Sequence, residues 1–222
     1  MRIYISAIIS LMTFIFPVYA LDIGYISSFI NSDSYTLEKE IKNNSDNEHH
    51  VNIQIERISS PLKNGKIIPM DKPGELLLTP ESLTLPANTR QSIYFTYQGK
   101  DDDKERYYRI IWLDQELHST QQNYPVHRSM IKIPTKIGTL IVVSPRKIKY
   151  DYQYNKGDIN NTGNATFKVI AYGPCLKSIS KTDCRENFFL IPGQNRELSR
   201  VDMSDENSHI SLWQSGQFVL IK

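Results

Sequence analysis

The sequence predicts an all-β protein that folds as two antiparallel β-sandwiches. Short segments in which apolar and polar side chains alternate recur along the chain, and this alternation is typical of strands with one buried face. Clusters of Gly, Pro, Asn and Asp separate these segments at the spacing found in sandwich folds. No segment has the apolar period of an amphipathic helix. About 200 residues follow an N-terminal leader, which is enough for two domains of about 100 residues each.

The leader occupies residues 1–20. Arg2 supplies a short positive start, and residues 8–16 form an apolar core. Val18 and Ala20 then place modest or small side chains at the positions that signal peptidase requires. A transmembrane helix needs about 20 apolar residues, and neither the leader nor any later segment is that long. We therefore expect export, cleavage after Ala20 and a mature chain without stable membrane insertion.

Strands are expected throughout the first half of the mature chain. The clearest is residues 51–55, where Val51, Ile53 and Ile55 alternate with polar residues. The segment YYRIIW at residues 107–112 is aromatic and β-branched, which suits a core strand. The other expected strands lie at residues 23–27, 35–41, 76–78, 83–85 and 93–97.

A longer stretch, from Ser129 to Pro145, divides the chain into two halves. Its first part, Met130 to Ile133, alternates apolar and polar side chains, whereas Leu140 to Val143 is a continuous apolar run typical of a strand buried on both faces. Lys136 stands at the junction. The preceding residues 114–128 are polar without an apolar period and predict a long loop, which is usually functional or disordered. The stretch is therefore an ordinary sandwich strand or, as a sharper hypothesis, a strand that pairs with another protein.

Beyond Pro145 the strand pattern restarts, so the first domain is expected at residues 21–145 and the second at residues 146–222. Cys175 and Cys184 lie in the second domain. In an exported protein such a pair usually forms a disulfide, here closing a small loop with a contribution of about 2–3 kcal/mol. Expected strands of this domain lie at residues 148–154, 167–171, 188–191 and 218–221, with another around Leu212.

Charge and motifs argue against several function classes. The net charge is only +2, and Lys and Arg are scattered among acids, so the chain lacks an electrostatic footprint for nucleic acid. His49-His50 and Asp101-Asp102-Asp103 are interpreted as solvated loops rather than metal sites. The sequence has no nucleophile elbow, zinc-protease motif or phosphate-binding glycine loop. We expect neither an enzyme nor a cofactor, although the many Asp and Glu residues leave a carboxylate pair open.

Longer segments of the mature chain carry a family resemblance. They are LDIGYISSFINSDSYTLEKEIKNNSD, MDKPGELLLTPESLTLPANT, KERYYRIIW, KIGTLIVVSPRK, NTGNAT, AYGPCLK and LIPG. With these segments the sequence resembles the periplasmic fimbrial chaperones. It is most similar to the branch that serves fimbriae of the common-pilus (Ecp/Mat) type.

The resemblance implies a fold, a compartment and a set of partners. The fold is two immunoglobulin-like sandwiches set in an L with a cleft between them, and the compartment is the periplasm. Such chaperones lend the last strand of their first domain to a pilin subunit that lacks its own final strand, and the subunit is later released at the outer-membrane usher. Pilin subunits and the usher are therefore the expected partners. A self-capping homodimer of the free chaperone is a further association that the sequence leaves open.

The resemblance places the lent strand in the stretch described above. A pilin that lacks a strand exposes an apolar groove and unpaired backbone groups, and an alternating strand satisfies both. Ile131 and Ile133 are the expected pocket-filling residues, with Met130 and Ile137 as secondary contacts. Met suits imperfect pockets because its side chain is flexible.

The resemblance also implies a basic residue that binds the C-terminal carboxylate of the subunit. Lys136 is the best match to this anchor. The better-known branch carries a second anchor, an arginine on the first strand, but residues 25–29 contain no basic residue. Either Lys136 works alone or another basic residue takes this role. Arg109 is the candidate substitute, and its alternative role is a strand arginine paired with an acid.

Two other function classes compete with the chaperone. A fibre subunit or adhesive tip should carry an N-terminal donor extension of alternating apolar residues, and Leu21-Asp22-Ile23 lies too near the first expected strand for that. A secreted hydrolase on a β scaffold lacks any motif in this sequence.

Overall fold

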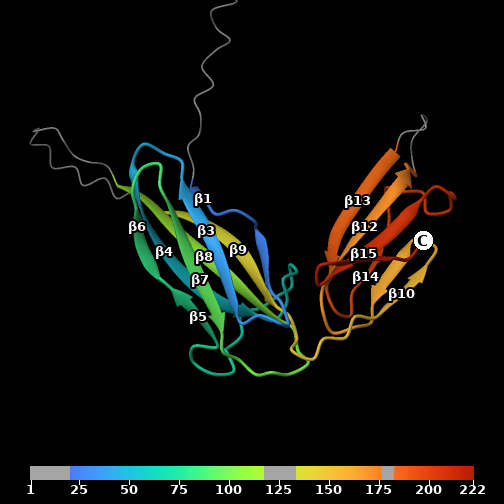
Figure 1. Cartoon of the computed structure of the whole chain (residues 1–222), viewed down its shortest axis with the longest axis horizontal. Coiled ribbons are helices and arrows are strands. Elements are labelled where there is room, and N and C mark those ends of the chain that lie inside the picture. Colours follow the sequence, from blue (N-terminus) through green and yellow to red (C-terminus); the bar gives the residue numbers. More distant parts are fainter. Residues whose placement is uncertain (1–20, 118–133, 177–182) are drawn as a thin grey trace, which may run out of the picture.

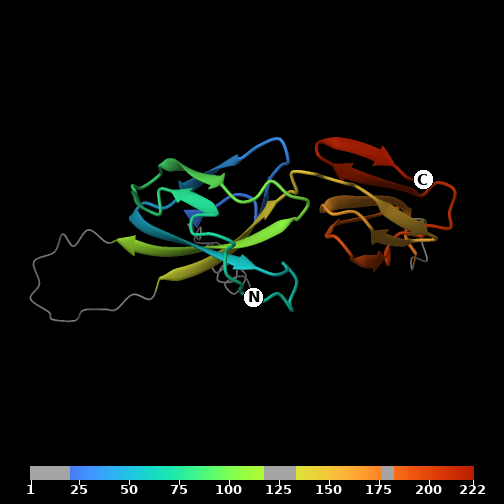
Figure 2. The ribbon, with the colours of Figure 1, turned by 90° about the horizontal axis from the view of Figure 1, so that it is seen from below.

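The computed structural model describes residues 21–117, 134–176 and 183–222, and every regular element in these residues is a β-strand. The strands form two sandwiches that meet at an angle through a short link (Figure 1 and Figure 2). The expected all-β class with two sandwich domains is therefore confirmed. Within the described ranges there is no helix with the length and apolar character needed to cross a bilayer.

The first domain packs two sheets face to face. One sheet contains, in spatial order, β1 (Leu21–Asp22), β3 (Thr36–Asn43), β7 (Arg90–Tyr97) and β5 (Leu76–Thr79). The other contains β2 (Ser27–Ile30), β9 (Thr135–Val143), β8 (Arg106–Leu117), β4 (Glu48–Ile58) and β6 (Ser82–Leu85). Neighbouring strands are antiparallel, except that β2 runs parallel to β9.

Alternation along β8 determines which side chains form the core of the first domain. Tyr108, Ile110 and Trp112 point inward and are fully buried. The ring of Trp112 meets Phe95 of the opposite sheet edge-to-face, with 6.4 Å between ring centroids. Its indole nitrogen donates a hydrogen bond to Thr139 Oγ1 at 2.9 Å. The YYRIIW segment therefore supplies the core as its composition predicted.

The first expected strand is divided between the two sheets. β1 pairs with β3, whereas β2 begins at Ser27 and pairs with β9. Between them Gly24 has a φ of 70°, a left-handed conformation that glycine adopts without steric cost. This turn leaves Tyr25 and Ile26 exposed. The prediction of one continuous strand over residues 23–27 is therefore wrong, because the turn moves the chain from one sheet to the other.

The second domain also has two sheets. One contains β10 (Tyr152–Asn155), β11 (Asp158–Asn161) and β14 (Asn195–Glu197), and the other contains β13 (Asp183–Leu190), β12 (Phe167–Pro174), β15 (His209–Gln214) and β16 (Gln217–Leu220). Its core includes the buried side chains of Phe167, Val169 and Leu212. Cys175 and Cys184 form the predicted disulfide where β12 ends and β13 begins.

Residues 144–151 link the last strand of the first domain to the first strand of the second. The expected domain boundary after Pro145 lies in this link. Arg146 nevertheless packs on the first domain, with its guanidinium carbon 4.4 Å from the ring centroid of Tyr35 and 5.2 Å from that of Tyr97. By its contacts the beginning of the link is part of the first domain.

Candidate functional site

One edge of β9 is only partly covered. β2 pairs with Leu140–Val143 alone. The preceding residues, Thr135–Thr139, pair with β8 on one side and with no described strand on the other. We call this five-residue segment the open edge. Unpaired N–H and C=O groups along a strand are a template for a strand of another chain.

The hydrogen-bond pattern of β9 shows which backbone groups the open edge presents. Leu140 donates its N–H to a carbonyl just ahead of β2 at 2.7 Å, so this group points away from β8. Backbone groups alternate between the two sides of a strand, so Lys136 and Gly138 also point theirs toward the open side. Ile137 and Thr139 point theirs toward β8. Another chain therefore meets the N–H and C=O groups of Lys136 and Gly138.

The predicted subunit-binding residues fall in two groups. Met130, Ile131 and Ile133 lie outside the described residues. Ile137 is described and is partly buried against the core of the first domain. The side chain of Ile137 thus supports the sandwich, and its contribution to subunit binding stays a prediction.

Lys136 lies at the beginning of β9, where it is exposed and opposite Leu113 of β8. β9 runs from there toward the second domain (Figure 1). The strand rises about 3.3 Å per residue, which puts Lys136 roughly 26 Å along the chain from Ser144 at the link. The structure therefore does not bring Lys136 to the junction of the domains, where the resemblance implies a carboxylate anchor. Its role as an anchor stays a prediction.

Arg109 lies beside the end of the open edge, opposite Leu140. Its Nη1 donates to Glu56 Oε2 at 3.3 Å, yet its side chain remains 45 % exposed. A charged, half-exposed guanidinium with one acidic partner keeps donors available for a second carboxylate. A hollow of about 320 Å³ surrounds it, which we call the Arg109 hollow. The hollow is lined by Ile26, Ser27, Ile58, Pro61, Arg109, Gly138, Thr139 and Leu140.

Specific polar contacts hold the two domains together. The Glu105 carboxylate, just before β8, accepts the N–H of Thr166 at 2.6 Å and its hydroxyl at 2.5 Å. The hydroxyl of Tyr107 also donates to Glu105, at 2.6 Å. Burial raises the pKa of the Glu105 carboxyl, while the hydrogen bonds from Thr166 and Tyr107 act in the opposite direction. Nearby, the side-chain amide of Asn164 donates to the carbonyl of Asp103 at 2.9 Å.

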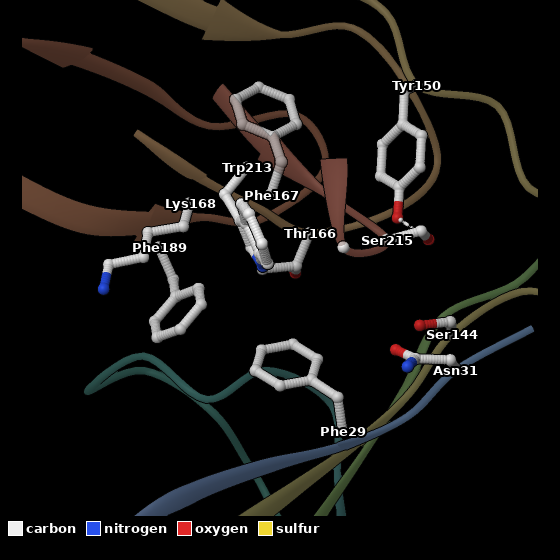
Figure 3. Close-up of a pocket in the computed structure, with 11 residues that line it drawn as sticks. Phe29, Asn31, Ser144, Tyr150, Thr166, Phe167, Lys168, Phe189, Trp213 and Ser215 are labelled. Carbon is white, nitrogen blue, oxygen red and sulfur yellow. Dashed lines mark hydrogen bonds between the residues drawn. The ribbon is translucent and has the colours of Figure 1, made fainter. Parts of the chain in front are cut away.

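A second hollow, of about 420 Å³, lies between the domains, and we call it the interdomain pocket. Figure 3 shows Phe29 of β2 pointing from the first domain toward side chains of the second. The rings of Phe29 and Phe189 are 5.2 Å apart between centroids. Trp213 and Tyr150 add further aromatic surface, and Lys168 contributes the one charged side chain among the described lining residues.

A buried charge cluster lies where β8 begins in the first domain. Arg106 is 4 % exposed and forms ion pairs with Asp102 at 2.8 Å, Asp71 at 3.2 Å and Glu75 at 3.1 Å. The hydrogen bonds from Arg106 lower the pKa of the Asp102 carboxyl to about 2. The interpretation of residues 101–103 as a solvated turn is therefore wrong for Asp102. Asp102 lies only four residues before Arg106, whereas Asp71 and Glu75 are distant in sequence and leave no signal in a local pattern.

The interpretation of His49 as a solvated loop residue is also wrong. His49 lies in β4 and is buried, with Nδ1 2.7 Å from Asp114 Oδ1 and Nε2 2.9 Å from the hydroxyl of Ser45. Ser45 is buried as well, and its hydroxyl also contacts Asn43 Oδ1 at 2.8 Å, so the network fastens the turn after β3 to β8. Within the part of the chain that the structure describes, no group of three or more His, Cys, Asp or Glu side chains is placed to hold a metal ion.

The chain and its fold are similar to known proteins. The model of the EcpB C-terminal domain family matches residues 150–221. The chain is 48% identical over 222 residues to the probable fimbrial chaperone EcpB of Klebsiella pneumoniae, with 100% of both chains covered. The crystal structure of the class 5 fimbriae chaperone CfaA superposes with a TM-score of 0.55 at 19% identity, covering 90% of this chain and 97% of that one. A complex of the chaperone CsuC with the tip subunit CsuE from Acinetobacter baumannii superposes with a TM-score of 0.52 at 12% identity, covering 91% and 97%.

Proposed function

Because the chain belongs to the EcpB family of fimbrial chaperones, we propose that it holds pilin subunits in the periplasm by donor-strand complementation and delivers them to the outer-membrane usher. Its relatives bear the name of a chaperone, which is a non-enzymatic role. A structural neighbour, CsuC, is in complex with a tip subunit. Residues 1–20 act in this proposal as the export signal, with cleavage after Ala20.

The open edge is the observation that carries the proposal. A subunit that lacks its final strand has its own unpaired edge, and pairing it with Thr135–Thr139 satisfies the backbone groups of both proteins. Ile131 and Ile133 fill the pockets of the subunit groove, with Met130 and Ile137 as secondary contacts. Each fully buried side chain of this size contributes about 1.5–3 kcal/mol.

The position of β2 fixes where the captured strand ends. β2 occupies the edge of β9 from Leu140 onward, so an added strand stops there. When that strand runs parallel to β9, its C-terminal end arrives beside the Arg109 hollow. We assign the binding of its terminal carboxylate to Arg109, a charge-assisted contact of about 1.5–3 kcal/mol. Lys136 meets the same strand at the other end of the open edge.

Co-expression of the mature protein with a pilin subunit that lacks its donor strand tests the proposal. We expect a 1:1 complex that stays together on size-exclusion chromatography, and a subunit that aggregates when the chaperone is omitted. The matched control is the same subunit completed with its own donor strand in cis, which has no groove left to fill. A deficient subunit that aggregates equally with and without this protein would remove the basis of the proposal.

A further inference from the structure

The interdomain pocket has the composition of a protein-binding site. Its aromatic side chains come from both domains, and two of them are open to solvent, with Phe189 47 % and Trp213 38 % exposed. Neighbouring exposed aromatic residues on a folded domain usually mark an interaction surface. Aromatic residues are also the side chains most often found at the centre of such surfaces.

The pocket and the Arg109 hollow are neighbours along β2. Ser27 lines the hollow and Phe29 lines the pocket, and the two residues stand on the same face of β2, about 7 Å apart. Their partners in β9, Leu140 and Val142, also share one face. A single protein seated on the open edge with its chain end at Arg109 therefore lies directly against the pocket.

We infer that the interdomain pocket receives a large apolar side chain of the captured subunit, so that the second domain forms part of the binding site; this inference rests on the proposed function. The side chain comes from a segment other than the paired strand, because that strand ends at the Arg109 hollow. Its ring or branched chain packs against the exposed surfaces of Phe29, Phe189 and Trp213 that line the pocket. An acidic residue beside it pairs with Lys168, whose Nζ lies 5.8 Å from the ring centroid of Phe189.

Trp213 reports directly on whether the pocket is filled. The chain has two tryptophans, and the other, Trp112, is fully buried in the first domain. The probe is the 1:1 complex with the donor-strand-deficient pilin subunit. We expect its formation to shift the emission of Trp213 to shorter wavelength and to protect it from acrylamide. The Trp213→Phe protein in the same complex serves as the blank, so signals from Trp112 and from the subunit cancel. An unchanged difference spectrum overturns the inference.

Substitutions in the pocket measure what the contact contributes. Because both side chains are partly exposed, Phe189→Ala and Trp213→Ala keep the core of the second domain intact, and we expect each to speed dissociation of the complex about tenfold. Tyr172→Ala is the matched control, since Tyr172 is an exposed aromatic residue of the same sheet, at 48 %, outside the pocket. Dissociation at the wild-type rate in both pocket variants contradicts the inference while leaving the proposed function standing. Failure of the wild-type protein to form any complex contradicts the proposed function instead.

Discussion

Two arginines three positions apart in β8 have different roles because their surroundings differ. Arg106 is buried among three carboxylates and holds the base of the first domain together. Arg109 is half-exposed, has one acidic partner and faces a hollow. The sequence suggested Arg109 as a substitute anchor only because it is a basic residue. The sequence did not distinguish the two arginines, because Asp71 and Glu75, which pair with Arg106, and Glu56, which pairs with Arg109, come from distant segments.

Removing the charge of Arg109 tests whether Arg109 or Lys136 binds the terminal carboxylate of the subunit. Arg109→Gln keeps a polar side chain of similar size but loses the contact with the terminal carboxylate. We expect the subunit to dissociate at least about tenfold faster, and Lys136→Gln to have a smaller effect. Arg109→Lys, which keeps the charge, should restore part of the affinity. Surface plasmon resonance with the captured subunit measures the rates, and a larger effect of Lys136→Gln would move the anchor to that residue.

The ion pair of Asp102 with Arg106 makes the first domain sensitive to acid. The pKa of Asp102 falls from an ordinary value of 3.8 to about 2 on folding, so the pair stabilises the domain above about pH 4 and this contribution is lost as the pH falls toward 2. Because the side chain of Asp102 is 28 % exposed, we discount the effect to about 1 kcal/mol. Asp102→Asn should lower the free energy of unfolding by that amount at pH 7, measured by urea with Trp112 emission in a Trp213→Phe background. Near pH 2 the variant and the parent should unfold alike, and a difference independent of pH would contradict the assignment.

At the scale of elements, β9 shows what sequence patterns predict and what they miss. Its continuous apolar half, residues 140–143, was expected to be buried on both faces. Ile141 and Val143 lie in the core of the first domain, and Val142 is buried in a separate cluster on the other face. The shortness of β2 was not predictable, because a glycine turn divides an alternating segment between two sheets. For this reason the open edge could not be predicted from the sequence, because it exists only where β2 is absent, before Ser27. Backbone pairing of this kind leaves no trace in side-chain composition.

A proline in the open edge tests whether its backbone groups bind the subunit. Gly138 points its N–H away from β8, and a Cβ added at this residue meets no atom within 4 Å. Gly138→Pro therefore removes one donor from the open edge while keeping the ladder with β8. We expect the yield of co-purified complex to fall several-fold, with little change in the melting temperature of the free protein. Gly138→Ala adds the Cβ but keeps the N–H, and it should capture subunit like the wild type; equal loss in both variants would assign the effect to sterics.

At the scale of the whole molecule, two separate cores are joined by a few polar contacts around Glu105 and Asn164 and by the aromatic pair of Phe29 and Phe189. The sequence predicted two sandwiches from strand spacing and length. It did not predict these contacts, because each joins positions about 60 or more residues apart. An interface between domains that consists of few contacts permits relative motion of the domains unless those contacts restrain it. The angle between the domains therefore depends on a few hydrogen bonds and on the apolar contacts of Phe29 and Ile191.

Glu105→Ala should loosen the arrangement of the domains, since it removes the acceptor for both donors of Thr166. We expect a larger radius of gyration in small-angle X-ray scattering of the mature protein. Asp103→Ala is the matched control, because Asp103 contributes its backbone carbonyl to the contact with Asn164 and keeps it in the variant. A scattering curve of Glu105→Ala that overlays the wild type would show that the remaining contacts suffice.

The short β2 has a consequence for the range of subunits that one chaperone serves. Because β2 blocks the edge of β9 from Leu140 onward, the end point of a captured strand is set by backbone geometry rather than by the identity of its side chains. On the proposed function, β2 thus limits how many residues a subunit can have between the strand beside its groove and its own C-terminal residue. We therefore expect subunits of unrelated sequence to bind when this length agrees, and a subunit with one residue more or less to bind more weakly.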